Sequence, residues 1–257
     1  MTIEKSLPDD AKHFIASVKP YCSSIILGGS WATQKADSSS DVDLCLVSPD
    51  ARNKNLIYQL VRGTLQNRKE KRLHLDVKAY TQEEFTTLIQ GIQNPYWYTF
   101  NRDGVLLFGE PLEVPLFRHT FSNSIWQTIE QVQEAIDFIE QRINLEIACY
   151  QLWTALSLSF TVDCLMRNEE FRKNSRIQLS RRLFGKHDKY IKEVYERVSL
   201  LRRTQLRAGM KLTDGQSLKC TRKSVSKPLD GIDTDTLHKC GMQVLSYCEK
   251  IYRQAMA

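Results

Sequence analysis

The chain has 257 residues, 42% of them hydrophobic and 26% charged, so it is long enough for two small domains with buried cores. It contains no run of eighteen apolar residues, and its first ten residues lack an apolar stretch, so we expect neither a transmembrane helix nor a signal peptide. Its seven scattered cysteines form no Cys-x-x-Cys pair, which is typical of reduced thiols. These features predict a cytoplasmic protein that does not engage a membrane.

The net charge of +6 is unevenly distributed along the chain. Residues 1–119 hold 14 basic and 14 acidic residues, so the second half supplies the whole excess. Residues 167–227, called the basic segment below, hold 18 basic and 6 acidic residues. Such a concentration of positive charge favours a polyanionic partner such as RNA, or an acidic protein, and disfavours a polycationic substrate.

The first half shows the mixed periodicity of an α/β domain. Apolar patterns and turn signals predict, in chain order, a helix over 8–20, a strand over 23–27, a turn at 28–30, a strand over 41–47, a helix over 54–65, a strand over 73–80, a helix from a capping box at 81–84 to about 90, and a short strand over 105–108. Pro111 and Pro115 indicate a linker, which places the end of this first domain at about residue 115.

The second half changes to a helical period, which predicts an all-α bundle over residues 120–257. The predicted helices cover about 125–143, 146–166, 175–184, 188–207 and 235–254. The second of them is apolar almost all round, as expected for the central helix of a bundle. Residues 209–231 are polar and basic and predict a mobile loop.

Three carboxylates stand on the predicted strands of the first domain. Asp41 and Asp43 are two residues apart, so on a strand their side chains share one face, roughly 6.5 Å apart along the chain. Asp76 lies in the next predicted strand. Like charges held this close repel each other unless a cation lies between them, and Mg²⁺ is a hard ion that prefers carboxylate and phosphate oxygens. We therefore expect a magnesium site.

A small turn, Gly28-Gly29-Ser30, lies directly before this acidic stretch. Glycines allow the backbone to approach a phosphate closely, and Ser30 offers both a hydroxyl and a backbone N–H. A phosphate-binding turn beside a carboxylate cluster suits phosphoryl or nucleotidyl transfer.

The stretch from Gly29 to Leu44 resembles the signature of the polymerase-β-like nucleotidyltransferase superfamily. The superfamily pattern is Gly-Ser, about ten residues, and then Asp-hydrophobic-Asp-hydrophobic, and Asp76 matches the third carboxylate. The minimal and aminoglycoside-type branch is the most similar, with Ala32 and Ser40 also in place. Gln34 departs from the pattern, since that branch has glycine there.

The resemblance implies a mixed-sheet nucleotidyltransferase core over 1–115 and assigns its residues. Asp41 and Asp43 would hold two Mg²⁺ ions, and Asp76 would hold the catalytic ion and help to deprotonate the acceptor hydroxyl. Gly29 and Ser30 would bind the phosphates of a nucleoside triphosphate, expected to be ATP. The enzyme would transfer a nucleoside monophosphate to a hydroxyl of RNA, protein or a small molecule and release pyrophosphate.

Two alternatives remain open at this stage. The first is an aminoglycoside-type antibiotic adenylyltransferase. The second is a toxin–antitoxin or regulatory binding protein, because the helical half weakly resembles HEPN domains, with Arg182 and His187 at the Arg-x₄-His spacing of HEPN ribonucleases.

Overall fold

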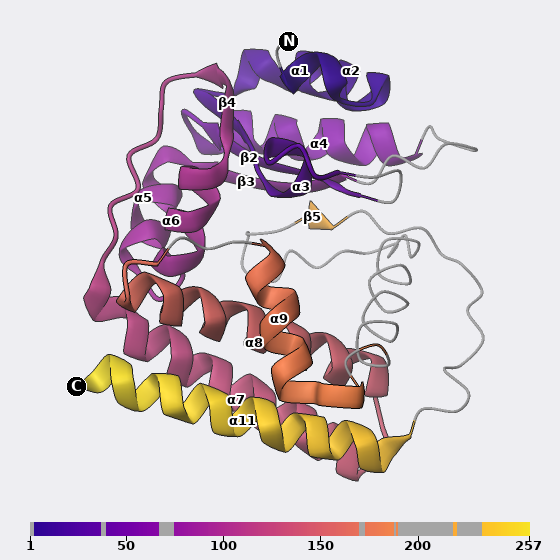
Figure 1. Cartoon of the computed structure of the whole chain (residues 1–257). Coiled ribbons are helices and arrows are strands. Elements are labelled where there is room, and N and C mark those ends of the chain that lie inside the picture. The colour runs from indigo at the N-terminus through magenta and orange to yellow at the C-terminus, as the bar shows by residue number, and fades with distance from the viewer. Residues whose placement is uncertain are drawn as a thin grey trace. The chain divides into compact units, whose positions relative to one another are not determined.

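The computed structural model describes residues 3–36, 40–66, 75–169, 173–187, 189, 218–219 and 233–257. The chain divides into two compact units, which we describe separately (Figure 1). The first contains Met1–Pro115 and Arg203–Lys223, and the second contains Leu116–Arg202 and Ser224–Ala257. The segment 203–223, which the sequence analysis assigned to the bundle, is therefore grouped with the first unit. We propose domains at 1–115 and 120–257 with this one reassignment.

The first unit is built on a mixed five-stranded sheet with the order β4-β1-β2-β3-β5. The strands are β1 (Ser24–Leu27), β2 (Val42–Ser48), β3 (Leu75–Thr81), β4 (Val105–Gly109) and β5 (Leu218–Lys219). Strands β2 and β3 are parallel, whereas the pairs β1–β2, β1–β4 and β3–β5 are antiparallel. The strands predicted around residues 25, 44 and 76 are thus direct neighbours, as the convergence of the carboxylates requires.

Helices cover both faces of this sheet. They are α1 (Ile3–Ser6), α2 (Asp9–Val18), the 3₁₀ turn η1 (Lys19–Tyr21), α3 (Gly29–Ala32), α4 (Ala51–Gln66), α5 (Gln82–Gln90) and α6 (Asn94–Asp103). One apolar cluster joins α2 and α4 to the face that includes Leu44 and Val77. A second joins α5 and α6 to the opposite face, which includes Cys45 and Tyr80. Since side chains alternate along a strand, Asp43 and Asp76 belong to the α5/α6 face.

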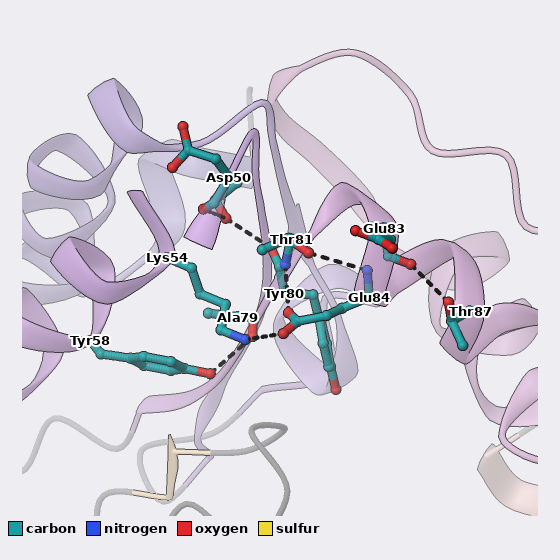
Figure 2. A network of polar contacts seen from close by, with 10 residues as sticks. Asp50, Lys54, Tyr58, Ala79, Tyr80, Thr81, Glu83, Glu84 and Thr87 are labelled. Atoms are coloured by element: carbon teal, nitrogen blue, oxygen red, sulfur yellow. Dashed lines mark hydrogen bonds and ion pairs between the residues drawn. The ribbon is translucent and has the colours of Figure 1, made fainter. Parts of the chain in front are cut away.

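A network of polar contacts lies at the carboxyl ends of β2 and β3 (Figure 2). Lys54 of α4, whose side chain is 11% exposed, forms an ion pair with Glu84 of α5. Glu84 also completes the capping box with Thr81. The Tyr58 hydroxyl donates to the Ala79 carbonyl over 3.0 Å. These contacts fasten two helices to the end of the sheet that lies away from the carboxylates.

The second unit is helical. Its helices are α7 (Phe121–Glu140), α8 (Leu145–Met166), α9 (Lys173–Phe184) and α11 (Thr234–Met256), with 3₁₀ turns η2 (Arg118–Thr120) and η3 (Gly185–His187). Helix α8 packs against both α7 and α11, which run side by side (Figure 1). This arrangement explains why α8 is apolar almost all round. His238 Nε2 lies 3.0 Å from Glu140 Oε1 and links α11 to α7.

The structure confirms the predicted fold class, a mixed-sheet α/β core followed by a helical region. Helices α1 and α6 were not predicted, and residues 29–32 form the short helix α3 where a turn was expected. The six described cysteines are buried, and none of them forms a disulfide with another. The loop predicted over 209–231 is wrong at two residues, which form strand β5. The helix predicted over 188–207 lies outside the described residues except for Lys189. Among the described helices, none has the length and apolarity needed to cross a membrane.

Candidate active site

The three predicted carboxylates come together at the amino ends of β2 and β3. Asp43 and Asp76 are direct partners in the parallel register, and Asp41 immediately precedes β2. One oxygen from each of the three side chains lies within 4.8 Å of the other two. All three are half-buried. Hard divalent cations prefer such a set of carboxylate oxygens, so the donor set fits Mg²⁺.

The glycine turn, Gly28-Gly29-Ser30, forms the start of α3 and lies against this cluster. The Gly28 N–H donates to the Asp43 carbonyl over 2.8 Å, which fixes the turn beside β2. Gly29 has φ +65, and a Cβ atom built there would lie 1.9 Å from Asp43 Oδ2. Only glycine tolerates both this conformation and this approach. The sequence places glycine at residue 29 because the backbone must pass directly over a carboxylate.

Helix α3 ends in a Schellman motif at Gln34, the position where the sequence departs from the family pattern. Gln34 has φ +56, in the left-handed region. The Gln34 N–H donates to the Trp31 carbonyl over 3.2 Å, and the Lys35 N–H donates to the Ser30 carbonyl over 2.8 Å. The backbone thus adopts the conformation that glycine favours, although the residue is glutamine. The substitution leaves the helix end intact and adds local strain.

Two residues near the cluster were missed by the sequence analysis. Lys78 lies two residues after Asp76 and therefore shares its face of β3. Its Nζ contacts the Tyr96 hydroxyl of α6 and lies 4.8 Å from the centroid of the Tyr96 ring. The alternation of β3 contained the signal for Lys78. Tyr96 could not be anticipated, because α6 itself was not predicted.

The carboxylates act on the charge of Lys78. Burial favours its neutral form, but the Tyr96 oxygen and the carboxylates of Asp76 and Asp43 outweigh burial and raise the pKa of Lys78 well above its ordinary value of 10.5. Burial also raises the pKa of Tyr96, although Lys78 opposes that effect. At neutral pH the site therefore holds an ammonium and a neutral phenol beside the carboxylates.

Comparison with known proteins agrees with this geometry. Residues 15–95 match the family model described as a nucleotidyltransferase domain. Residues 15–95 therefore form a nucleotidyltransferase domain, in agreement with the resemblance to the polymerase-β-like superfamily. The matched range contains the carboxylate cluster, the glycine turn and Lys78. The superfamily and the enzyme class predicted from the sequence are confirmed.

A solved structure extends the likeness of fold beyond the matched range. The spectinomycin adenyltransferase from Enterococcus faecialis, in complex with ATP and spectinomycin, matches with a TM-score of 0.50 and 11% sequence identity. The match covers 92% of this chain and 97% of that chain. At this identity the likeness shows a shared fold. No curated protein sequence matches the chain.

The described residues of the basic segment give little support for a polyanion-binding site. Arg167 donates two hydrogen bonds to Asp163, so its charge is balanced within the helical unit. Arg182 is exposed on α9, but that helix ends at Phe184, and His187 lies in the following 3₁₀ turn after Gly185, which has φ +55. The Arg-x₄-His pair is thus not presented by one continuous helix. Apart from residues 167–169, 173–187, 189 and 218–219, the basic segment lies outside the described residues.

Proposed function

We propose that the enzyme transfers the nucleoside monophosphate of a triphosphate, in particular AMP from ATP, to an acceptor hydroxyl. The observation that carries the proposal is the carboxylate cluster, whose oxygens gather within 4.8 Å beside the Gly28–Gly29 turn. Asp41, Asp43 and Asp76 hold the metal, and Asp76 also helps to remove the acceptor proton. Mg²⁺ bound there supplies activation of the hydroxyl and neutralisation of the departing pyrophosphate.

The glycine turn acts on the nucleotide. Without side chains at residues 28 and 29, a phosphate can approach the backbone next to the carboxylates. Ser30 adds a half-exposed hydroxyl and a backbone N–H on the same turn. We assign phosphate binding to Gly29 and Ser30. With the nucleotide held by this turn and the acceptor proton taken at Asp76, positioning and charge carry most of the catalysis.

The test is nucleotidyl transfer with each labelled NTP, Mg²⁺ and a panel of acceptors, using wild type and the Asp41→Asn/Asp43→Asn variant. We expect label transfer from ATP by the wild type and a loss of roughly a thousandfold in the variant, because several kcal/mol of transition-state stabilisation are removed. Transfer that survives in the double variant would contradict the site assignment.

Two acceptor classes follow from different observations. The excess of positive charge in residues 167–227 favours a polyanionic acceptor such as RNA, or a protein partner. The likeness of fold over 92% of the chain to a protein that binds ATP and spectinomycin favours a small hydroxylated molecule. Salt separates the two classes, because transfer to RNA would fall steeply with ionic strength, whereas transfer to a small molecule of low charge would change little. The regulatory binding alternative gains no support from Arg182 and His187.

A further inference from the structure

Lys78 occupies the next position along the strand face that carries the carboxylates. In the parallel register Asp43 faces Asp76, and Cys45 faces Lys78 two residues further on. The Cα atoms of Asp76 and Lys78 are therefore separated by roughly 6.6 Å along β3, with both side chains on the α5/α6 face. A lysine side chain is long enough to bring its charge back toward the carboxylates.

Aromatic side chains of α6 hold the ammonium in place. Its Nζ lies 4.8 Å from the ring centroid of Tyr96, 5.8 Å from that of Phe100 and 5.9 Å from that of Trp97. Among the residues that the structure describes, the Tyr96 hydroxyl is its one side-chain hydrogen-bond partner, and no carboxylate lies within 4.0 Å of it. An ammonium has three donors, and a neutral hydroxyl does not cancel its charge. The positive charge is fixed but not neutralised by an ion pair.

The same helix also positions the glycine turn. A Cβ atom built on Gly28 would lie 2.1 Å from the ring of Phe100, so the turn packs directly on that side chain. Phe100 therefore packs on the turn, and the Lys78 ammonium lies 5.8 Å from the centroid of the same ring. Helix α6 thus sets where the turn, and any phosphate bound to it, stands relative to this cation.

We propose that Lys78 makes the carboxylate cluster select metal that arrives bound to a nucleotide over free metal. The inference rests on the proposed function, since it takes Asp41, Asp43 and Asp76 as metal-holding residues. A fixed positive charge on the strand face that carries Asp43 and Asp76 repels a free divalent cation bound to those carboxylates. A triphosphate adds negative charge to the metal, so the same lysine attracts the metal–nucleotide complex. Lys78 is a positioning residue in this scheme and touches no reacting atom.

The expected size of both effects follows from charge and distance. A single charge about 7 Å from a divalent ion changes its binding by close to tenfold, even with the full screening of water. At the same distance and with the same screening, a metal–triphosphate complex of net charge about −2 is attracted by about the same amount. Loss of the lysine should therefore tighten the binding of free metal and weaken the binding of metal–nucleotide, each by about tenfold.

The experiment measures both affinities without turnover. Free Mn²⁺ is followed by its electron paramagnetic resonance signal, with Mn²⁺ alone and then with Mn²⁺ and a non-hydrolysable ATP analogue. The proteins are wild type, Lys78→Met, Lys78→Arg and Asp41→Asn/Asp43→Asn. Lys12→Met is the matched control, because it removes one positive charge from a partly exposed lysine of helix α2 in the same unit. Lys78→Gln is a second neutral variant that can still hydrogen-bond to Tyr96.

We expect Lys78→Met and Lys78→Gln to bind bare Mn²⁺ about tenfold more tightly and the metal–nucleotide about tenfold more weakly than wild type. Lys78→Arg and Lys12→Met should stay close to wild type in both. A merely structural role would weaken both affinities together, and that outcome overturns the inference, as does an unchanged affinity for bare Mn²⁺. If neither wild type nor the Lys78 variants bind Mn²⁺ above the level of Asp41→Asn/Asp43→Asn, the metal site of the proposed function fails as well.

Discussion

The two ends of strands β2 and β3 differ in the charged side chains that they bring together. At the carboxyl ends, the Lys54 ammonium forms an ion pair with Glu84, and the Thr81 backbone N–H donates to the same carboxylate (Figure 2). At the amino ends, Asp41, Asp43 and Asp76 gather three like charges. The cation beside them, Lys78, donates to a neutral phenol.

This difference separates stability from function within one sheet. Opposite charges in contact lower the free energy of the folded state when their hydrogen bonds are made, whereas like charges held together raise it. A cluster that repels itself persists because the strand register and the glycine turn fix it in place. Like charges gathered at one end and an ion pair at the other are the pattern expected where stability is exchanged for a binding site.

Among the single substitutions, the largest effect should come from Gly29→Ala, which adds a Cβ atom beside the Asp43 carboxylate. The added Cβ would meet the Asp43 carboxylate in a backbone conformation that alanine disfavours, so the carboxylate or the turn must move. A displacement of about 1 Å typically costs a hundredfold in rate, and we expect at least that loss of nucleotidyl transfer. Label transfer at saturating ATP measures it.

Gly63→Ala is the matched control, because Gly63 lies within α4 and an added Cβ there meets nothing within 4 Å. It should leave transfer unchanged and stabilise the fold by about 0.8 kcal/mol, since alanine is the better helix former. Equal activity of the two alanine variants would show that Gly29 has no role in holding the carboxylates.

At the other end of the strands, Lys54→Met should reduce stability by about 2 kcal/mol, because it removes the partner of Glu84 and leaves a half-buried carboxylate without its cation. The Glu84 side chain is 46% exposed, so water offsets part of the loss. Chemical denaturation measures the change. Nucleotidyl transfer at a temperature where both proteins are folded should not change, and a large loss of activity would contradict the division of roles between the two ends.

The loss of stability at acid pH should depend on the same ion pair between Lys54 and Glu84. Partial burial raises the pKa of Glu84, but the hydrogen bonds from Lys54 and Thr81 outweigh it and lower the pKa below its ordinary value of 4.5. A carboxylate whose pKa is lowered by folding stabilises the protein at pH values above its pKa in the unfolded chain. This contribution is lost as the pH falls through its pKa in the folded protein. Denaturation from about pH 5 downward should therefore show a shallower loss in Lys54→Met than in wild type. Parallel curves would mean that Lys54 does not act on this carboxylate.

The smallest effect should come from Gln34→Gly, which restores the residue that the family has at the end of α3. Relief of a left-handed glutamine gains about 1 kcal/mol, and the greater freedom of glycine in the unfolded chain removes part of it. We expect a net gain of roughly 0.5 kcal/mol in thermal unfolding, with transfer unchanged. A loss of stability would show that the glutamine side chain makes a contact that outweighs its backbone strain.

The sequence predicted the site better than its surroundings. Asp41, Asp43 and Asp76 could be placed together because alternation along strands is regular and a spaced pair of carboxylates is rare by chance. Lys78 could have been placed by the same alternation, but it was missed because a lone lysine on a strand carries no chemical pattern of its own. Tyr96 and Phe100 depend on α6, which was not predicted although its aromatic residues after Pro95 include pairs at helical spacing.

Strand β5 could not be predicted, since two residues carry no periodicity and its pairing is set by tertiary contact. Leu218 and Lys219 stand opposite Val77 and Asp76 in the register. Only the finished fold brings such distant parts of the chain together.

That pairing has a consequence for how the molecule assembles. Asp76 and Lys219 are 143 positions apart, so the sheet is completed by residues that leave the ribosome long after the rest of its strands. Closing so long a loop is entropically slow, and until then β3 presents unpaired backbone groups to any other extended chain. A fragment that stops at residue 115 would keep this edge open permanently. The first 115 residues therefore encode the three carboxylates but not the complete sheet that carries them.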